Sequence, residues 1–132
     1  MTLIVATFGQ PENIRKPGDD ARIFRYPVTI VDANDMNTPR QASRTKSLRI
    51  KTLVTGSHGG WGLSDSDLIK VLFEFAKERL ATHLNSSDPS LDKDLDISIN
   101  GTLKGPCPYD PNTIQEPSGA VVQIDIHRRI GF

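Results

Sequence analysis

A glycine-rich turn at residues 56–62, with the sequence GSHGGWG, is the segment whose residue types come closest to a phosphate-binding motif. Such motifs need Lys-Ser/Thr after the last glycine, or a third glycine where the next helix opens, and here Asp65 takes that place. Asp65 and Asp67 would also put two carboxylates in the first helical turn, where they repel an anion. We therefore predict a flexible connection with Trp61 packing locally, and no nucleotide site.

Serine, histidine and cysteine residues form no catalytic or metal-binding pattern. Ser57 and His58 are adjacent on one loop, whereas a nucleophile, its base and the orienting acid come from separate elements. The three histidines have no ligand spacing among themselves or with Cys107. The sequence thus predicts no enzyme activity, no metal ion and no cofactor. Cys107 is expected to be a free thiol, with an interchain disulfide as the alternative.

Positive charge gathers in the first half of the chain, although the net charge is zero. Residues 1–60 hold nine Lys/Arg against five Asp/Glu (+4), and residues 61–132 hold seven against eleven (−4). Five of the nine basic residues lie between Arg40 and Lys51. Such a run is either a solvated surface or a face that neutralises phosphate, and both interpretations carry equal weight here.

Two predicted strands, residues 22–32 and 46–54, position these cations. Side chains alternate between the two faces of a strand. The apolar positions are Phe24, Tyr26, Val28, Ile30, Leu48, Ile50 and Val54, and the polar ones between them are Arg25, Thr29, Arg49 and Lys51. If the strands pair as a hairpin across the polar loop 33–44, the polar set shares one face. Pro27 interrupts the ladder and indicates an edge or a bulge.

A helix is predicted from Ser64, its N-cap, to Leu84. Its polar stripe is limited to Lys70, Glu74, Lys77 and Glu78. An edge helix of a small monomer needs an apolar face of only about 100°. The helix at 64–84 is apolar over more of its circumference than that. This predicts an obligate dimer, in which the sheet covers one side of the helix and a partner chain covers the other. The expected interface residues are Leu68, Leu72, Phe73, Phe75 and Leu80.

The remaining elements are strands, at residues 2–8, 95–100 and 120–126. The chain is predicted to be a single α+β domain, 1–132, with a β-rich part at 1–55, the helix at 64–84 and a second β-rich part at 94–127. The expected architecture is a mostly antiparallel sheet with one long helix packed on one face. The proline-rich segment 105–118 is expected to be an exposed loop for contacts between dimers.

The hairpin and the helix start resemble the coat proteins of single-stranded RNA bacteriophages (levivirus-like). Residues 27–31 and 44–54 are similar to their central sheet strands, and residues 63–70 to the start of the helix that follows. The likeness covers about residues 22–84. It implies a sheet whose helices clasp a second subunit, so that two sheets join into one, with RNA-contacting residues on the outer face. That family usually ends in a second helix, whereas residues 94–127 here read as strands.

The resemblance implies a structural capsid protein that assembles as dimers into an icosahedral shell and packages single-stranded RNA. Arg25, Thr29, Arg49 and Lys51 would face the RNA. The expected location is the virion, assembled in the cytoplasm of a bacterial host, and no membrane partner is expected because no apolar run approaches about 18 residues. Two other functions stay open: another phage virion component, such as a tail-tube or head-completion protein, and a small nucleic-acid-binding module.

Overall fold

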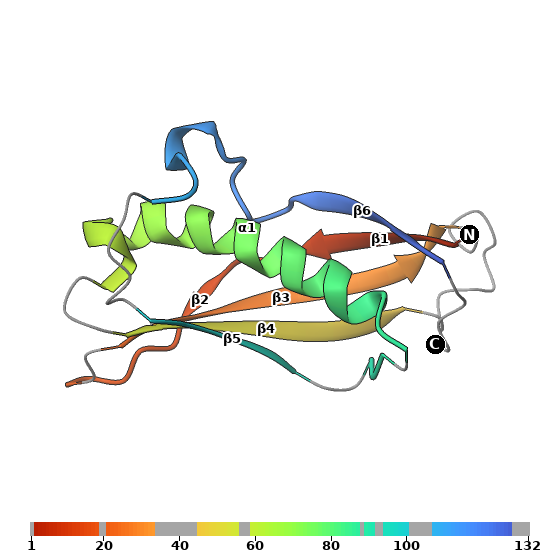
Figure 1. Cartoon of the computed structure of the whole chain (residues 1–132), viewed down its shortest axis with the longest axis horizontal. Coiled ribbons are helices and arrows are strands. Elements are labelled where there is room, and N and C mark those ends of the chain that lie inside the picture. The colour runs from red at the N-terminus through yellow and green to blue at the C-terminus, as the bar shows by residue number, and fades with distance from the viewer. Residues whose placement is uncertain are drawn as a thin grey trace.

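The computed structural model describes residues 2–18, 21–33, 45–55, 59–87, 89–91, 94–100 and 107–127. A curled, mostly antiparallel sheet carries the helix α1 (Asp65–Leu84) across one face (Figure 1). The strands are β1 (Thr2–Phe8), β2 (Glu12–Asn13), β3 (Arg22–Asp32), β4 (Lys46–Thr55), β5 (Leu95–Asn100) and β6 (Val121–Ile126). The predicted α+β class, with a long helix on one face of the sheet, is confirmed.

The strands follow the order β5-β4-β3-β1-β6, and β2 pairs with β3 beside the end of β1. β3 and β4 form the predicted antiparallel hairpin. β4 and β5 are parallel, and the chain between them crosses over through α1, as parallel neighbours require. The sequence did not predict β2, because two residues are too few to show alternation.

Pro27 lies in the central strand β3, opposite an interruption of the neighbouring strand. β1 ends where Phe8 pairs with Val28, and the Gly9 N–H then donates to the Pro27 carbonyl at 2.9 Å. β2 resumes the pairing at Asn13. A Cβ on Gly9 would stand 3.2 Å from the Pro27 ring, so a larger residue there would press on it. The position agrees with the predicted bulge and not with an edge.

The core lies between the sheet and α1. Phe8 meets Phe73 edge to face, with ring centroids 4.8 Å apart. Tyr26 is fully buried, and its hydroxyl donates to the Ile69 carbonyl of the helix at 2.6 Å. Burial raises the pKa of Tyr26 well above its usual value. The phenol therefore stays protonated and ties the helix to the sheet.

The predicted dimer-interface residues of α1 are core residues of the single chain. Leu68, Leu72, Phe73 and Leu80 are at most 1% exposed, and only Phe75 of the predicted set remains half-buried. The single chain therefore already buries most of the apolar circumference from which we inferred an obligate dimer, and the dimer itself stays a prediction.

Two segments of the chain cover the helix from outside the sheet. One is the 3₁₀ turn η3 (Gly59–Gly62), and the other is the 3₁₀ turn η4 (Pro111–Thr113) together with the residues on either side of η4. Phe75 stacks on Trp61 of η3, with centroids 6.3 Å apart, and meets Tyr109 edge to face at 5.3 Å. Ile114 packs against the core and Pro117 is buried. Residues 107–118 form no strand, as predicted, but they pack on the helix and are not a freely exposed loop. Residues 101–106 lie outside the described part of the chain.

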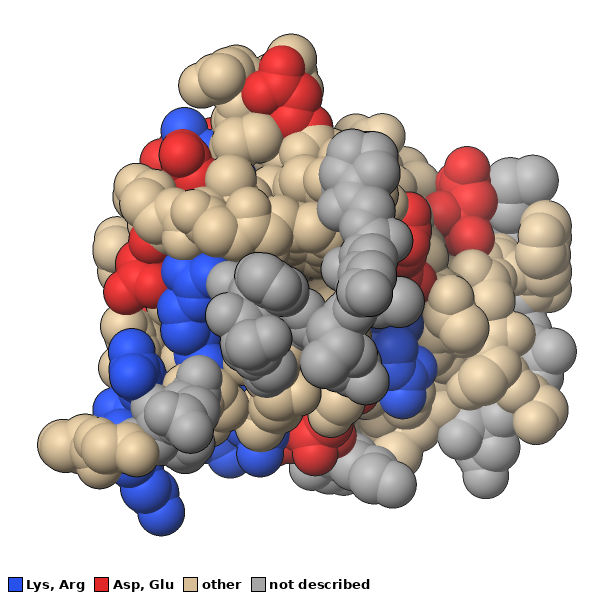
Figure 2. Space-filling view, turned by 60° about the vertical axis from the view of Figure 1, so that its left-hand side comes forward, with Lys and Arg blue, Asp and Glu red and all other residues tan. Residues whose placement is uncertain are grey.

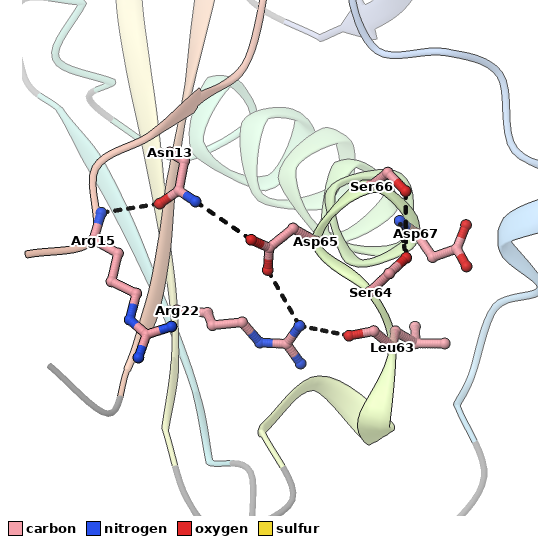
Figure 3. Close-up of polar contacts among 8 residues, drawn as sticks. All are labelled: Asn13, Arg15, Arg22, Leu63, Ser64, Asp65, Ser66 and Asp67. Atoms are coloured by element: carbon pink, nitrogen blue, oxygen red, sulfur yellow. Dashed lines mark hydrogen bonds and ion pairs between the residues drawn. The ribbon is translucent and has the colours of Figure 1, made fainter. Parts of the chain in front are cut away.

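Polar contacts fasten the start of α1 to β2 and β3 (Figure 3). The Ser64 side chain accepts from the Asp67 N–H at 3.3 Å, as expected of the N-cap. The Asp65 carboxylate accepts from Asn13 and from Arg22, each at 3.4 Å, and Arg22 also donates to the Leu63 carbonyl. A negative charge thus already occupies this helix start. Residues 56–58, the first part of the glycine-rich turn, lie outside the described residues.

Candidate nucleic-acid interface

The sheet face turned away from α1, called here the open face, carries all four residues predicted to contact RNA. In the hairpin, Arg25 pairs with Lys51, and Pro27 with Arg49. Thr29 pairs with Ser47, two residues further along each strand than the Pro27–Arg49 pair. Directly opposite residues point to the same side of a sheet, with Cβ atoms about 5 Å apart. The hairpin therefore gathers the three cations and the hydroxyls into one patch.

The patch is accessible to different degrees. The side chain of Arg49 is 55% exposed, and Thr29 and Ser47 are exposed as well. Arg25 and Lys51 are half-buried. Ser47 was absent from the predicted set, although its place two residues before Arg49 puts it on the same face by alternation alone.

Acidic residues flank the cations, which the sequence did not predict. Across the sheet, one row runs Glu12, Arg25, Lys51, Asp96. Arg49 forms an ion pair with Asp94 at 3.2 Å. Two cations directly opposite each other repel, and carboxylates at both ends of the row offset that repulsion.

Figure 2 views an end of the molecule on which basic and acidic residues also lie close together.

The ion pair between Arg49 and Asp94 is exposed, and an exposed ion pair contributes at most about 1 kcal/mol. A phosphate could therefore replace Asp94 as the partner of Arg49 at little cost in free energy. The acids were not anticipated because they reach the patch through β2 and through the parallel β4–β5 register, neither of which the sequence indicated.

Aliphatic pairs lie on both sides of the cationic row. Ile23 pairs with Leu53 and Val5 with Val31, and all four side chains are half-buried. Val121, on edge strand β6, is 57% exposed and pairs with Thr7 on the same face. The open face thus carries three cations in the middle, carboxylates beside them, and aliphatic side chains further along the strands.

Two further reactive groups, Tyr109 and Cys107, lie on the helix side. The Tyr109 hydroxyl donates to Glu78 Oε1 at 2.7 Å, and that hydrogen bond raises the pKa of Tyr109 to about 12. Cys107 is a free, half-buried thiol whose Sγ donates to the Tyr109 carbonyl at 3.0 Å. Within the described ranges no three His, Cys, Asp or Glu side chains could hold a metal ion, and no helix is long and apolar enough to cross a membrane.

No protein-family model, no curated protein and no solved structure matches this chain.

Proposed function

We propose that this chain is a structural subunit that self-associates into a virion-like shell and binds single-stranded RNA on the open face of its sheet. The observation that carries the proposal is the hairpin register, which puts Arg25, Arg49 and Lys51 on the face that α1 leaves uncovered. Phosphate neutralisation by such a patch needs no base recognition and no catalytic group.

The number of cations sets the strength expected of one copy. Each phosphate contact on a single strand contributes about −0.7 to the slope of log K against log salt, so three contacts give about −2. Affinity should then fall about 18-fold between about 50 and 200 mM salt. Binding by one copy would be weak. A pair of copies with a shared sheet would double the number of contacts.

Self-association is proposed at the β6 edge. β5 and β6 each pair with a single strand of the described chain, and an unpaired edge is a template for another strand. Asp94 and Asp96 beside the β5 edge would repel their copies, whereas β6 carries the exposed Val121. An antiparallel β6–β6 pair that keeps both helices on one side can place Ile124 opposite its own copy and Gln123 opposite Asp125, by the alternation of faces.

Salt-dependent RNA binding tests the RNA part of the proposal. Arg49→Ala with Lys51→Ala removes two of the three cations. The slope of log K against log salt should then become shallower, from about −2 to about −0.7. Lys70→Ala with Arg79→Ala, on the helix, removes the same charge and should leave the slope unchanged. Equal slopes for both double variants would contradict RNA binding on the open face.

The association state and the particles test the structural part. Gln123→Asp would set one new acid against Asp125 of the other copy, twice in each dimer, and should shift the dimer to monomer in light scattering, whereas Gln123→Lys should retain it. Electron microscopy should show closed spheres for the unmodified chain. Stacked rings would favour a tail-tube protein, and dispersed small particles a small nucleic-acid-binding module.

A further inference from the structure

The aromatic residues that the structure describes lie on the helix side of the sheet. The chain has eight, and the structure describes all but Phe132. Phe8, Phe24, Tyr26 and Phe73 are buried in the core. Trp61, Phe75 and Tyr109 form a chain of ring contacts along α1. None of these seven rings is on the open face.

Proteins that bind unpaired bases generally offer aromatic rings for the bases to stack on. Each stacked base adds about 5- to 160-fold to affinity, which makes stacking the main contribution of the bases in such sites. The described part of the open face offers instead aliphatic and hydroxyl side chains next to its cations, such as Leu53, Val31 and Thr29. These side chains give a base no ring to stack on.

The spacing of the cations suits a phosphate backbone. Arg49 and Lys51 are two residues apart on β4, which is about 6.6 Å along a strand. That is close to the through-space distance between successive phosphates of one strand, which exceeds the axial rise per nucleotide, so the two cations can meet neighbouring phosphates of a strand that runs along β4. Arg25, opposite Lys51, adds a third contact at the side.

Resting on the proposed function, we infer that the open face binds the sugar–phosphate backbone of a single strand and is indifferent to its bases. The ligand class is any unpaired polyribonucleotide, taken up along β4. The aromatic residues take no part in binding, and Trp61 serves as an internal reporter, since it is the chain's one tryptophan and stacks on Phe75 on the other side of the sheet.

The experiment compares three strands of about 20 nucleotides: oligouridylate, oligoadenylate, and a strand of the same length with abasic sugars in place of the bases. Fluorescence anisotropy gives the affinity of each for the full chain. Trp61 emission is recorded in the same titrations. We expect three affinities within about threefold of one another, equal salt slopes, and Trp61 emission that does not change on binding.

Two results would overturn the inference while leaving the proposed function standing. One is a loss of about tenfold or more for the abasic strand, and the other is quenching of Trp61 by oligoadenylate. In both cases the weakening caused by Arg49→Ala with Lys51→Ala would still locate binding on the open face. If no strand binds, or if that double variant binds as well as the unmodified chain, the proposed function itself fails. Trp61→Phe is the control, and it should retain the affinity.

Discussion

The two faces of the sheet are built by the same strands, yet they differ in almost every physical property. On the covered face, Phe24, Tyr26 and Ile50 are fully buried under α1. On the open face, their chain neighbours Arg25, Arg49 and Lys51 carry charge and stay partly exposed. Alternation alone separates the two sets. Stability and binding can therefore be changed independently by substitutions one residue apart.

The largest expected effect comes from placing a carboxylate on the covered side. Phe73→Asp should cost several kcal/mol, because Phe73 is 1% exposed between Phe8 and Tyr26 and the new charge would have no partner. A loss of that size is comparable to the whole stability of a small domain. Far-ultraviolet circular dichroism should show an unfolded chain, and not a folded monomer that has lost only assembly.

Val121→Asp is the matched change on the open face. Val121 is 57% exposed, so the free energy of unfolding should change by no more than about 0.5 kcal/mol. If urea titration shows similar losses for Val121→Asp and Phe73→Asp, the distinction between the two faces does not hold.

Alkaline pH should weaken the covered face through Tyr26. An unfolded tyrosine ionises near pH 10, whereas burial raises the pKa of Tyr26 well above that value in the folded chain. The unfolded state then binds fewer protons above about pH 10, so stability is intact below that pH and falls by about 1.4 kcal/mol per pH unit above it.

Tyr26→Phe separates this effect from other alkaline titrations, including that of Tyr109. The variant loses the hydrogen bond to the Ile69 carbonyl, which should cost about 1 kcal/mol at neutral pH. Its stability should then fall less steeply above pH 10 than that of the unmodified chain. Urea unfolding across that range measures both slopes, and parallel slopes would show that Tyr26 ionises normally in the folded state.

On the open face, removal of acids should strengthen RNA binding. Asp94→Asn with Asp96→Asn releases Arg49 from its ion pair and takes one carboxylate from the end of the Arg25–Lys51 row. Each exposed pair contributes about 0.2–1 kcal/mol, so affinity should rise by about 2- to 30-fold. Asp110→Asn with Glu116→Asn, on the helix-side segment, is the control. Equal gains from both double variants would indicate a general charge effect.

The smallest expected effect is local. Glu78→Gln should lower the pKa of Tyr109 from about 12 toward the usual value, because the carboxylate that favours the protonated phenol is gone. Ultraviolet difference absorbance of the phenolate measures the change. The free energy of unfolding should move by no more than about 0.5 kcal/mol at neutral pH, as for other surface substitutions. An unchanged titration would contradict the hydrogen bond.

Elements with a regular period were predictable from the sequence. The alternation in residues 22–32 and 46–54 indicated β3, β4 and the side on which each residue lies, and Ser64 marked the start of α1. The segment 107–118 was not predictable in its packing, because prolines and single apolar residues such as Ile114 show no period. Without that packing, the sequence left the second side of the helix uncovered, and this gap was the reason for inferring a partner chain there.

Contacts that depend on how distant strands pair could not be predicted from the sequence either. Asp96 alternates with Leu95 and Ile97, so its face within β5 could be foreseen. Its place at the end of the Arg25–Lys51 row depends on the parallel pairing of β5 with β4, which no local pattern encodes. The predicted RNA-facing residues thus came together on one face, while the acids that moderate their charge were missed.

Lysine footprinting with and without RNA tests the central claim most directly. An acylating reagent modifies Lys51 on the open face and Lys70 on the helix in the same sample, and mass spectrometry reports both. The account predicts that saturating single-stranded RNA protects Lys51 and leaves the modification of Lys70 unchanged. Protection of Lys70 with no protection of Lys51 would contradict it and would move the binding surface to the helix.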